Sequence, residues 1–144
     1  LPGLAEKADE SRVYELERAY KWSGWAYFKN GKFQDALTAW LHQVALDEKS
    51  TRPNSVVRGY AYHNVAHALQ ATGDLPQAKS YYEKALTLFE SAHKQDPELE
   101  EFSNNLESVL RSYASLLRQM GDQAKAEVLE KERESLLGKS APQK

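Results

Sequence analysis

Three glycines lie at matching places in a repeated pattern, and the repeat limits what this chain can fold into. Gly31 and Gly73 are 42 residues apart, and Gly73 and Gly121 are 48 apart. The same two offsets relate a small residue before each glycine and an alanine after it. The matching small residues are Gly24, Ala66 and Ala114, and the matching alanines are Ala36, Ala78 and Ala126. Coincident offsets of this kind indicate one structural unit that occurs three times.

The segments between these glycines have the composition and spacing of helices. They are rich in Ala, Leu, Glu, Lys, Gln and Arg, and their apolar residues recur every three or four positions. The chain has no isoleucine, and no run alternates Val and Thr as a strand would. We therefore predict an all-α fold, with helices at about 9–29, 33–49, 54–72, 75–95, 97–119 and 122–137.

Turn residues predict where these helices begin and end. Asp74 and Asp122 each follow a turn glycine and are expected to cap the next helix. Asp96 stands before Pro97, which predicts a capped helix that starts at the proline. The first ten residues form either a loose arm or an extension of the first helix. Residues 139–144 are predicted to be a disordered tail.

The repeated unit resembles the tetratricopeptide repeat, in which large, small, glycine, alanine and aromatic residues follow at fixed intervals. The first unit carries Tyr20, Gly24, Tyr27, Gly31, Phe33, Ala36 and Trp40. The second carries Tyr62, Ala66, Leu69, Gly73, Ala78, Tyr82 and Ala85. The third carries Leu110, Ala114, Leu117, Gly121 and Ala126, with Glu130 in place of the aromatic. A worn third unit is typical of a terminal repeat that faces solvent.

The resemblance covers about residues 15–137 and implies a right-handed α-solenoid of about six helices. Its three helix-turn-helix units are expected at about 15–49, 57–95 and 105–137, within one domain over 1–140. The spacing of 42 exceeds the common period of about 34 residues and is similar to the lengthened repeats of kinesin light chains.

In tetratricopeptide proteins the first helices of the units line a concave groove that binds a peptide or protein segment. Helical spacing places one stripe of each first helix on that groove. The candidate groove residues are Arg18, Lys21, Trp25, Phe28, Tyr60, His63, Asn64, His67, Arg111 and Arg118, with Gln70, Ser108 and Ser115 beside them. None is a carboxylate, although the chain has a net charge of -2. We therefore expect a non-catalytic adaptor, scaffold or assembly factor that binds an acidic or carboxylate-bearing partner.

One subgroup of the family grips the C-terminal carboxylate of chaperones with a set of Lys, Asn and Arg side chains. The present chain matches that set only at Lys21 and Asn64, because Trp25, Ser108 and Ser112 occupy the other places. Binding of a chaperone tail is therefore not expected.

His63 and His67 lie four residues apart, which places both imidazoles on one face of a helix. This spacing permits a shared metal ion if a third ligand comes from another helix, so metal binding is a minor alternative. The other interpretations are half-buried, groove-lining histidines, or histidines that titrate near pH 6.5 and make partner binding depend on pH.

An apolar stripe near the N-terminus offers a structural alternative. Val13, Leu16 and Tyr20 share one face of the first helix. If the second helix does not cover this stripe, we expect a homodimer surface. The chain could equally form part of a larger repeat array.

Several functions are not expected from the composition. The absence of cysteine excludes thiol chemistry, Cys-ligated zinc and iron–sulfur clusters. A pI near 6.1 argues against nucleic-acid binding, and no apolar stretch is long enough for membrane insertion. Phosphate loops and nucleophile elbows are missing, so we predict no enzyme and no cofactor. The expected protein is soluble, and its sequence favours the cytoplasm only slightly over the periplasm or secretion.

Overall fold

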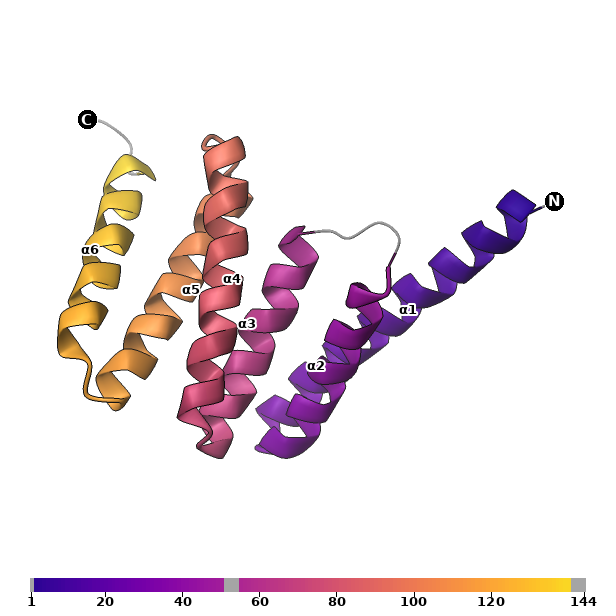
Figure 1. The fold of residues 1–144 in the computed structure, drawn as a ribbon, viewed down its shortest axis with the longest axis horizontal. Helices are drawn as coiled ribbons and strands as arrows, with labels where there is room; N and C mark the ends of the chain where they lie inside the picture. Colours follow the sequence, from indigo (N-terminus) through magenta and orange to yellow (C-terminus); the bar gives the residue numbers. More distant parts are fainter. Residues whose placement is uncertain (1, 51–54, 141–144) are drawn as a thin grey trace.

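The computed structural model describes the backbone of residues 2–50 and 55–140, and the side chains of 9–50 and 56–139. It consists of six helices and has no strand in these ranges: α1 (Pro2–Lys29), α2 (Phe33–Glu48), α3 (Ser55–Thr72), α4 (Leu75–Gln95), α5 (Glu100–Gln119) and α6 (Gln123–Ser140). The helices lie side by side in chain order, and the two ends of the chain lie at opposite ends of the row (Figure 1). The predicted all-α solenoid is confirmed.

The helices form three hairpins that stack in sequence. Helix α1 packs against α2, α3 against α4 and α5 against α6, while the α2–α3 and α4–α5 contacts join one hairpin to the next. Each hairpin turns at one of the repeated glycines, Gly31, Gly73 and Gly121, whose φ angles are 75°, 91° and 85°. Residues with a Cβ rarely adopt such angles, which explains why glycine recurs at these three places.

Side-chain caps follow two of the turns, as predicted. The Asp74 carboxylate accepts a hydrogen bond from the backbone N–H of Gln77 at the start of α4. The Asp122 carboxylate accepts one from Lys125 at the start of α6. Both caps satisfy an N–H that has no partner within its own helix.

The start predicted at Pro97 is wrong. Helix α5 begins at Glu100, after Leu99, and the Asp96 side chain does not cap it. The backbone N–H of Asp96 bonds to the Ala92 carbonyl, so Asp96 closes the last turn of α4 instead.

The structure favours one of the two alternatives for the N-terminal residues, and its C-terminal helix is longer than predicted. Helix α1 begins at Pro2, so the N-terminal residues extend the first helix. Helix α6 runs through Lys139 and Ser140, the first two residues of the predicted tail. The rest of that tail, 141–144, lies outside the described residues.

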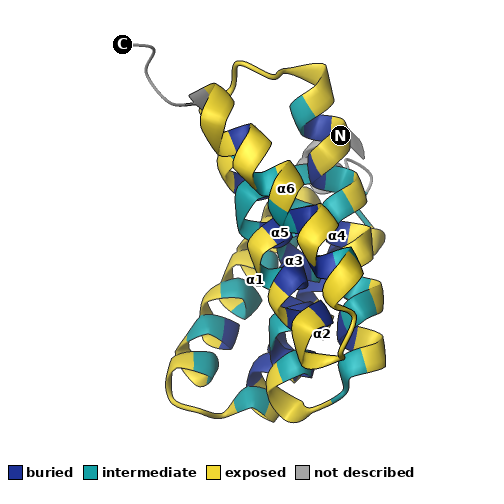
Figure 2. Ribbon diagram, turned by 90° about the vertical axis from the view of Figure 1, so that its left-hand side faces the viewer, coloured by how far each residue is buried: buried dark blue, intermediate teal, exposed yellow. Residues whose placement is uncertain are grey.

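Residue size is matched within the first two hairpins. Trp40 of α2 is fully buried against Gly24 of α1, where an added Cβ would collide with the indole ring. The second hairpin has Tyr82 and Ala66 at these two places, both fully buried. The larger ring, Trp40, thus lies opposite glycine, and the smaller ring, Tyr82, opposite the larger residue alanine. Figure 2 shows the buried residues gathered between the helices, with exposed residues on the outer surfaces.

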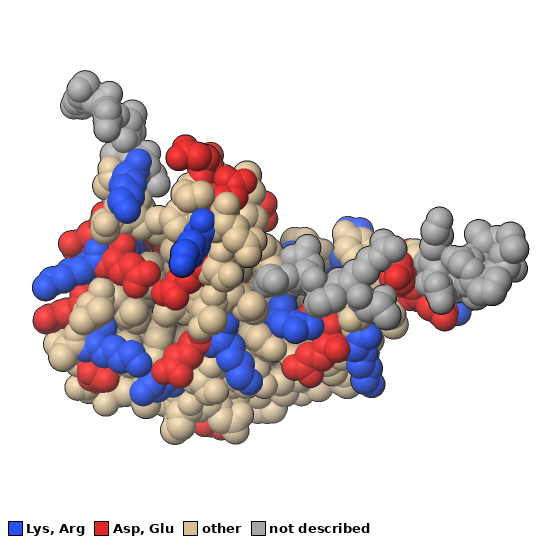
Figure 3. Space-filling model, turned by 45° about the horizontal axis from the view of Figure 1, so that its top comes forward, with Lys and Arg blue, Asp and Glu red and all other residues tan. Residues whose placement is uncertain are grey.

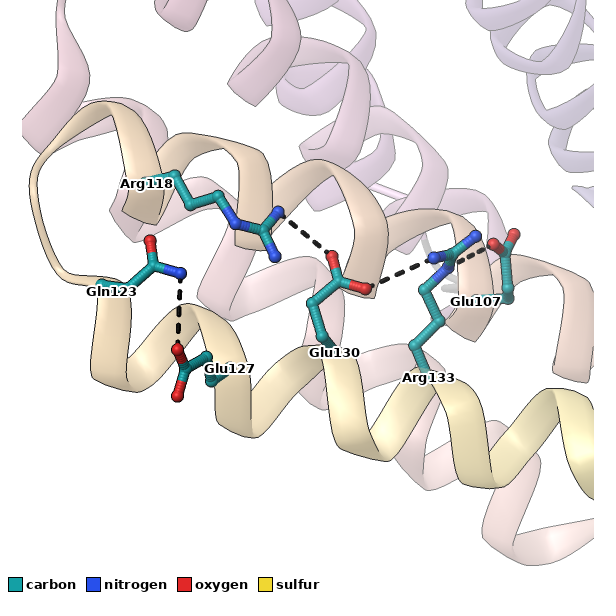
Figure 4. Close-up of polar contacts among 6 residues, drawn as sticks. All are labelled: Glu107, Arg118, Gln123, Glu127, Glu130 and Arg133. Carbon is teal, nitrogen blue, oxygen red and sulfur yellow. Dashed lines mark hydrogen bonds and ion pairs between the residues drawn. The ribbon is translucent and has the colours of Figure 1, made fainter.

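The last hairpin has ion pairs in addition to its buried apolar residues, such as Ala126 and Leu129. Glu130, at the place of the aromatic, contacts Arg118 and Arg133 at 3.3 Å each, and Arg133 contacts Glu107 of α5 at 2.7 Å (Figure 4). These four side chains run along the α5–α6 junction. Glu130 is therefore a structural partner at the C-terminal edge and not only a solvated charge, as the sequence suggested.

These ion pairs form a ladder in which the Arg133 guanidinium is central. Removing this group should measure what the ladder contributes to the free energy of unfolding. Arg133→Ala is expected to lower the free energy of unfolding by about 1 kcal/mol, because Arg133 and the two carboxylates that it joins are only partly exposed. Urea unfolding followed by circular dichroism measures the change. Lys131→Ala, at an exposed position of the same helix, is the control. Equal effects of the two substitutions would contradict a role for the ladder.

Candidate functional site

The inner face of the first helices contains a small hollow near the centre of the chain. It has a volume of about 410 Å³ and lies between α1, α3 and α5. The lining side chains are Phe28, His67, Gln70, Ala71, Arg111, Ser112 and Ser115. We call it the inner hollow. Most of these residues belong to the stripes selected by helical spacing, and none is a carboxylate.

A second and larger hollow lies beside the N-terminal half of α1. Its volume is about 1110 Å³, and its walls come from α1, the C-terminal part of α2 and the start of α3. We call it the N-terminal hollow. The candidate residues Arg18 and Lys21 line it together with four carboxylates, Asp9, Glu10, Glu17 and Asp47.

The expectation of a groove without carboxylates is therefore wrong at its N-terminal end. Helix α1 packs on α2 and diverges from α3 towards the N-terminus (Figure 1), and residues near the end of α2 line the hollow. Asp47 lines the hollow from α2. The candidate groove residues were all taken from the first helix of each unit, so α2 was not considered.

The aromatic candidates on α1 belong largely to the core. Trp25 and Phe28 pack edge to face with ring centroids 5.9 Å apart. Each also contacts the buried Trp40, at 5.2 and 5.7 Å. Trp25 is therefore held by α2, and only Phe28 of the two lines the inner hollow.

Tyr60 and Lys21 link α1 to α3 and α5, which are the first helices of the second and third hairpins. The Tyr60 hydroxyl donates a hydrogen bond to the side-chain oxygen of Asn105 on α5. The Lys21 ammonium lies 5.7 Å from the centre of the Tyr60 ring and 5.2 Å from that of Trp22. Both candidates are thus engaged within the fold, although both remain partly exposed.

The two histidines form a stacked pair behind the inner hollow. Their ring centroids are 4.6 Å apart, and the His63 Nε2 lies 3.1 Å from the Ser112 hydroxyl. The buried Tyr82 packs edge-on against both rings at 5.8 Å. His63 is buried and His67 is half-buried, so only His67 reaches the wall of the hollow.

The predicted titration of this pair near pH 6.5 is wrong. Burial, the neighbouring His67 and the charge of Arg111 together lower the pKa of His63 to about 3. Burial and Arg111 also lower the pKa of His67. Within the described residues, no three His, Asp or Glu side chains are grouped to hold a metal ion, so the pair has no third ligand of these types there.

Asn64 does not reach the groove surface. Only 4% of the residue is exposed, and its side-chain nitrogen has no hydrogen-bond partner among the described residues. The Asn64 side chain also lines neither of the two hollows.

The two C-terminal arginines differ in their surroundings. Arg118 is paired with Glu130 of α6 (Figure 4), whereas Arg111 is exposed and makes no salt bridge in the described part of the chain. The charge of Arg111 lowers the pKa of both histidines, which shows that its positive potential extends into the inner hollow. Elsewhere, on the face shown in Figure 3, basic and acidic side chains are interspersed, as on an ordinary solvated surface.

The predicted apolar stripe on α1 is partly covered. Tyr20 stacks on His42 of α2 with ring centroids 5.0 Å apart, and Val13 is half-buried. Leu16 remains 48% exposed, and Tyr14 and Trp22 are each 60% exposed. Helix α2 therefore covers one end of the stripe and leaves several large side chains of α1 open.

Sequence reasoning missed three polar residues at the base of the N-terminal hollow: Glu17, Gln43 and Asp47. The repeat itself held a signal for two of them. The offset of 42 aligns Glu17 with Gly59, and Asp47 with Phe89, which contact each other in the second hairpin. Two acidic residues at places that form an apolar contact in the next repeat would have marked the site.

A family model described as tetratricopeptide repeat matches residues 15–91, more than half of the chain. The chain belongs to the tetratricopeptide repeat family. No protein with a curated description matches the sequence. Tetratricopeptide repeats are in general protein-interaction modules and typically non-catalytic scaffolds.

Among solved structures, the chain is similar to the crystal structure of BtubC (BKLC) from P. vanneervenii. The TM-score is 0.66 at 18% sequence identity, and the match covers 92% of the present chain. It covers 56% of the BtubC chain, so the present chain spans little more than half of that protein. At this identity the likeness supports the helical-repeat fold. No helix in the described residues has the length and apolar character needed to cross a membrane.

Proposed function

We propose that this tetratricopeptide repeat protein binds an acidic segment of a partner protein at the inner hollow. The observation that carries the proposal is Arg111, an exposed arginine that has no described salt bridge and lines a hollow without carboxylates. A guanidinium in this position can hold a carboxylate through two parallel hydrogen bonds.

The rest of the hollow suits the same ligand. Ser115 is exposed and can donate a hydroxyl hydrogen bond to an anion, while the ring of Phe28 supplies an apolar wall. At about 410 Å³ the hollow accommodates one or two side chains of a partner. The acidic contact is therefore local, and it is smaller than a groove built from all ten candidate residues.

A selection of random peptides on the purified protein tests the proposal. Peptides retained by the wild-type chain should be enriched in Asp and Glu. Arg111→Ala should lower the affinity for the tightest-binding of these peptides by about tenfold or more, because charge-assisted hydrogen bonds contribute about 1.5 to 3 kcal/mol. Fluorescence anisotropy measures the change in affinity, and circular dichroism shows whether the variant is folded.

Arg12→Ala is the matched control, because it removes one exposed charge from the outer part of α1 and leaves the inner hollow intact. Its affinity for the selected peptides should equal that of the wild type. Selected peptides without acidic residues, or equal losses in the two variants, would contradict the proposal.

A further inference from the structure

The N-terminal hollow has two hydrogen-bond acceptors at its base that no donor in the described residues satisfies. Gln43 is 2% exposed, and its side-chain oxygen has no partner among the described residues. One carboxylate oxygen of Glu17 is buried in the same way. Buried acceptors without donors destabilise a fold, so a donor from outside the chain would be favourable here.

Next to these acceptors lies a second carboxylate, that of Asp47. Asp47 is 3% exposed and forms an ion pair with Arg58 of α3 through one of its oxygens. Burial and the charge of Asp47 raise the pKa of Glu17. The four carboxylates of the hollow lie beside three lining cations, Arg18, Lys21 and Lys49. At the base, Asp47 is paired with Arg58, whereas one oxygen of Glu17 has no donor among the described residues.

Packing does not account for this arrangement. In the second hairpin the equivalent places hold Gly59 and Phe89, and the phenyl ring of Phe89 fills the space beside the glycine. The first hairpin has Glu17 and Asp47 there instead. Since a buried Asp47 and a half-buried Glu17 stabilise a core less than an aromatic contact does, a ligand is the better explanation for their presence.

We propose that the N-terminal hollow binds an arginine side chain of a partner protein, whose guanidinium donates to Glu17 and Gln43. The five N–H groups of a guanidinium can reach several separate acceptors at once, which an ammonium reaches less well. The proposal concerns a separate hollow and does not depend on the acidic segment proposed above.

The size and rim of the hollow fit such a ligand. A volume of about 1110 Å³ holds an arginine side chain with neighbouring residues of an extended segment. Trp22 and Tyr14, each 60% exposed, also line the hollow, and their rings suit contact with a cation. Each ring already lies near a cation of the chain: Trp22 is 5.2 Å from the Lys21 ammonium, and Tyr14 is 5.8 Å from the Arg18 guanidinium. Without a group of three metal-binding side chains in the described residues, a peptide cation fits better than a metal ion.

Nuclear magnetic resonance with the ¹⁵N-labelled chain tests the proposal. The probe is an acetylated and amidated Gly-Gly-Arg-Gly-Gly peptide, and the two comparison peptides carry citrulline or lysine in place of arginine. The arginine peptide should shift the indole N–H signal of Trp22 and the amide signals near Gln43 in a saturable manner. The citrulline peptide, which has the same shape and no charge, should produce no saturable shift.

Glu17→Gln and Glu15→Gln form a matched pair, because each removes one negative charge from α1 and only Glu17 lines the hollow. Glu17→Gln should lower the affinity for the arginine peptide by about tenfold, and Glu15→Gln should leave this affinity unchanged.

Three results would overturn the proposal: equal effects of the arginine and citrulline peptides, equal affinity for the lysine peptide, or saturable shifts of the same signals by calcium alone. The peptide comparison uses only the wild-type chain, so it decides the matter even if a variant fails to fold.

Discussion

Gly24→Ala should lower the free energy of unfolding by about 2 to 3 kcal/mol, although alanine is the better helix former. The added Cβ would collide with the indole of Trp40. That ring is fully buried, and its N–H donates a hydrogen bond to the backbone oxygen of Lys21 at 3.2 Å. The ring cannot move away without losing both its packing and this bond. Urea unfolding at neutral pH measures the effect.

A second substitution tests the cause of that loss. Trp40→Tyr combined with Gly24→Ala reproduces the pair formed by Tyr82 and Ala66 in the second hairpin. The double variant should be about 1 to 2 kcal/mol more stable than the sum of the two single effects predicts, because the smaller ring leaves room for the Cβ. Ser23→Ala, an exposed neighbour on the same helix, controls for a change of helix propensity. Strictly additive effects would contradict size matching.

The same size matching explains why the fold could be predicted from the sequence. A turn at positive φ selects glycine, and a close helix approach selects a small residue opposite a large one, so both leave a periodic signal. The segment from Pro97 to Leu99 carries no such signal. There, the end of α4 depends on a backbone hydrogen bond from Asp96, and a capping motif read from side chains alone misplaced the next helix.

The candidate site was harder to predict, because helical spacing shows which residues share a face but not what covers that face. Arg118 has the same periodic place as Arg111, yet α6 supplies Glu130 to pair with it. Trp25 lies on the predicted stripe, yet Trp40 of α2 holds its ring. The N-terminal hollow depends on side chains from three helices, so only a comparison between repeats could have indicated it.

Acid should destabilise the folded chain through His63. The unfolded imidazole has its ordinary pKa of 6.5, and the folded one has a pKa of about 3, so between these values only the unfolded chain binds the proton. The contribution of His63 to the free energy of unfolding is therefore fully present above pH 6.5 and is lost as the pH falls towards 3. From pH 7 the expected loss is about 2 kcal/mol at pH 5 and about 3 kcal/mol at pH 4.

Other titratable groups with shifted pKa values increase or decrease this loss of stability. The lowered pKa of His67 adds to it, since that ring also resists protonation in the folded chain. The raised pKa values of Glu17 and Glu90 oppose it, because these carboxyl groups bind protons more readily when folded. Total stability against pH therefore mixes several contributions, and a comparison with a variant is needed to isolate His63.

His63→Phe provides that comparison, because phenylalanine keeps a ring between His67 and Tyr82 and does not titrate. The loss of unfolding free energy between pH 7 and pH 5 should be about 2 kcal/mol smaller in the variant than in the wild type. His42→Gln, at an exposed position of α2, should leave the difference unchanged. If His63→Phe loses as much stability as the wild type over this range, the buried neutral imidazole is not the source of acid sensitivity.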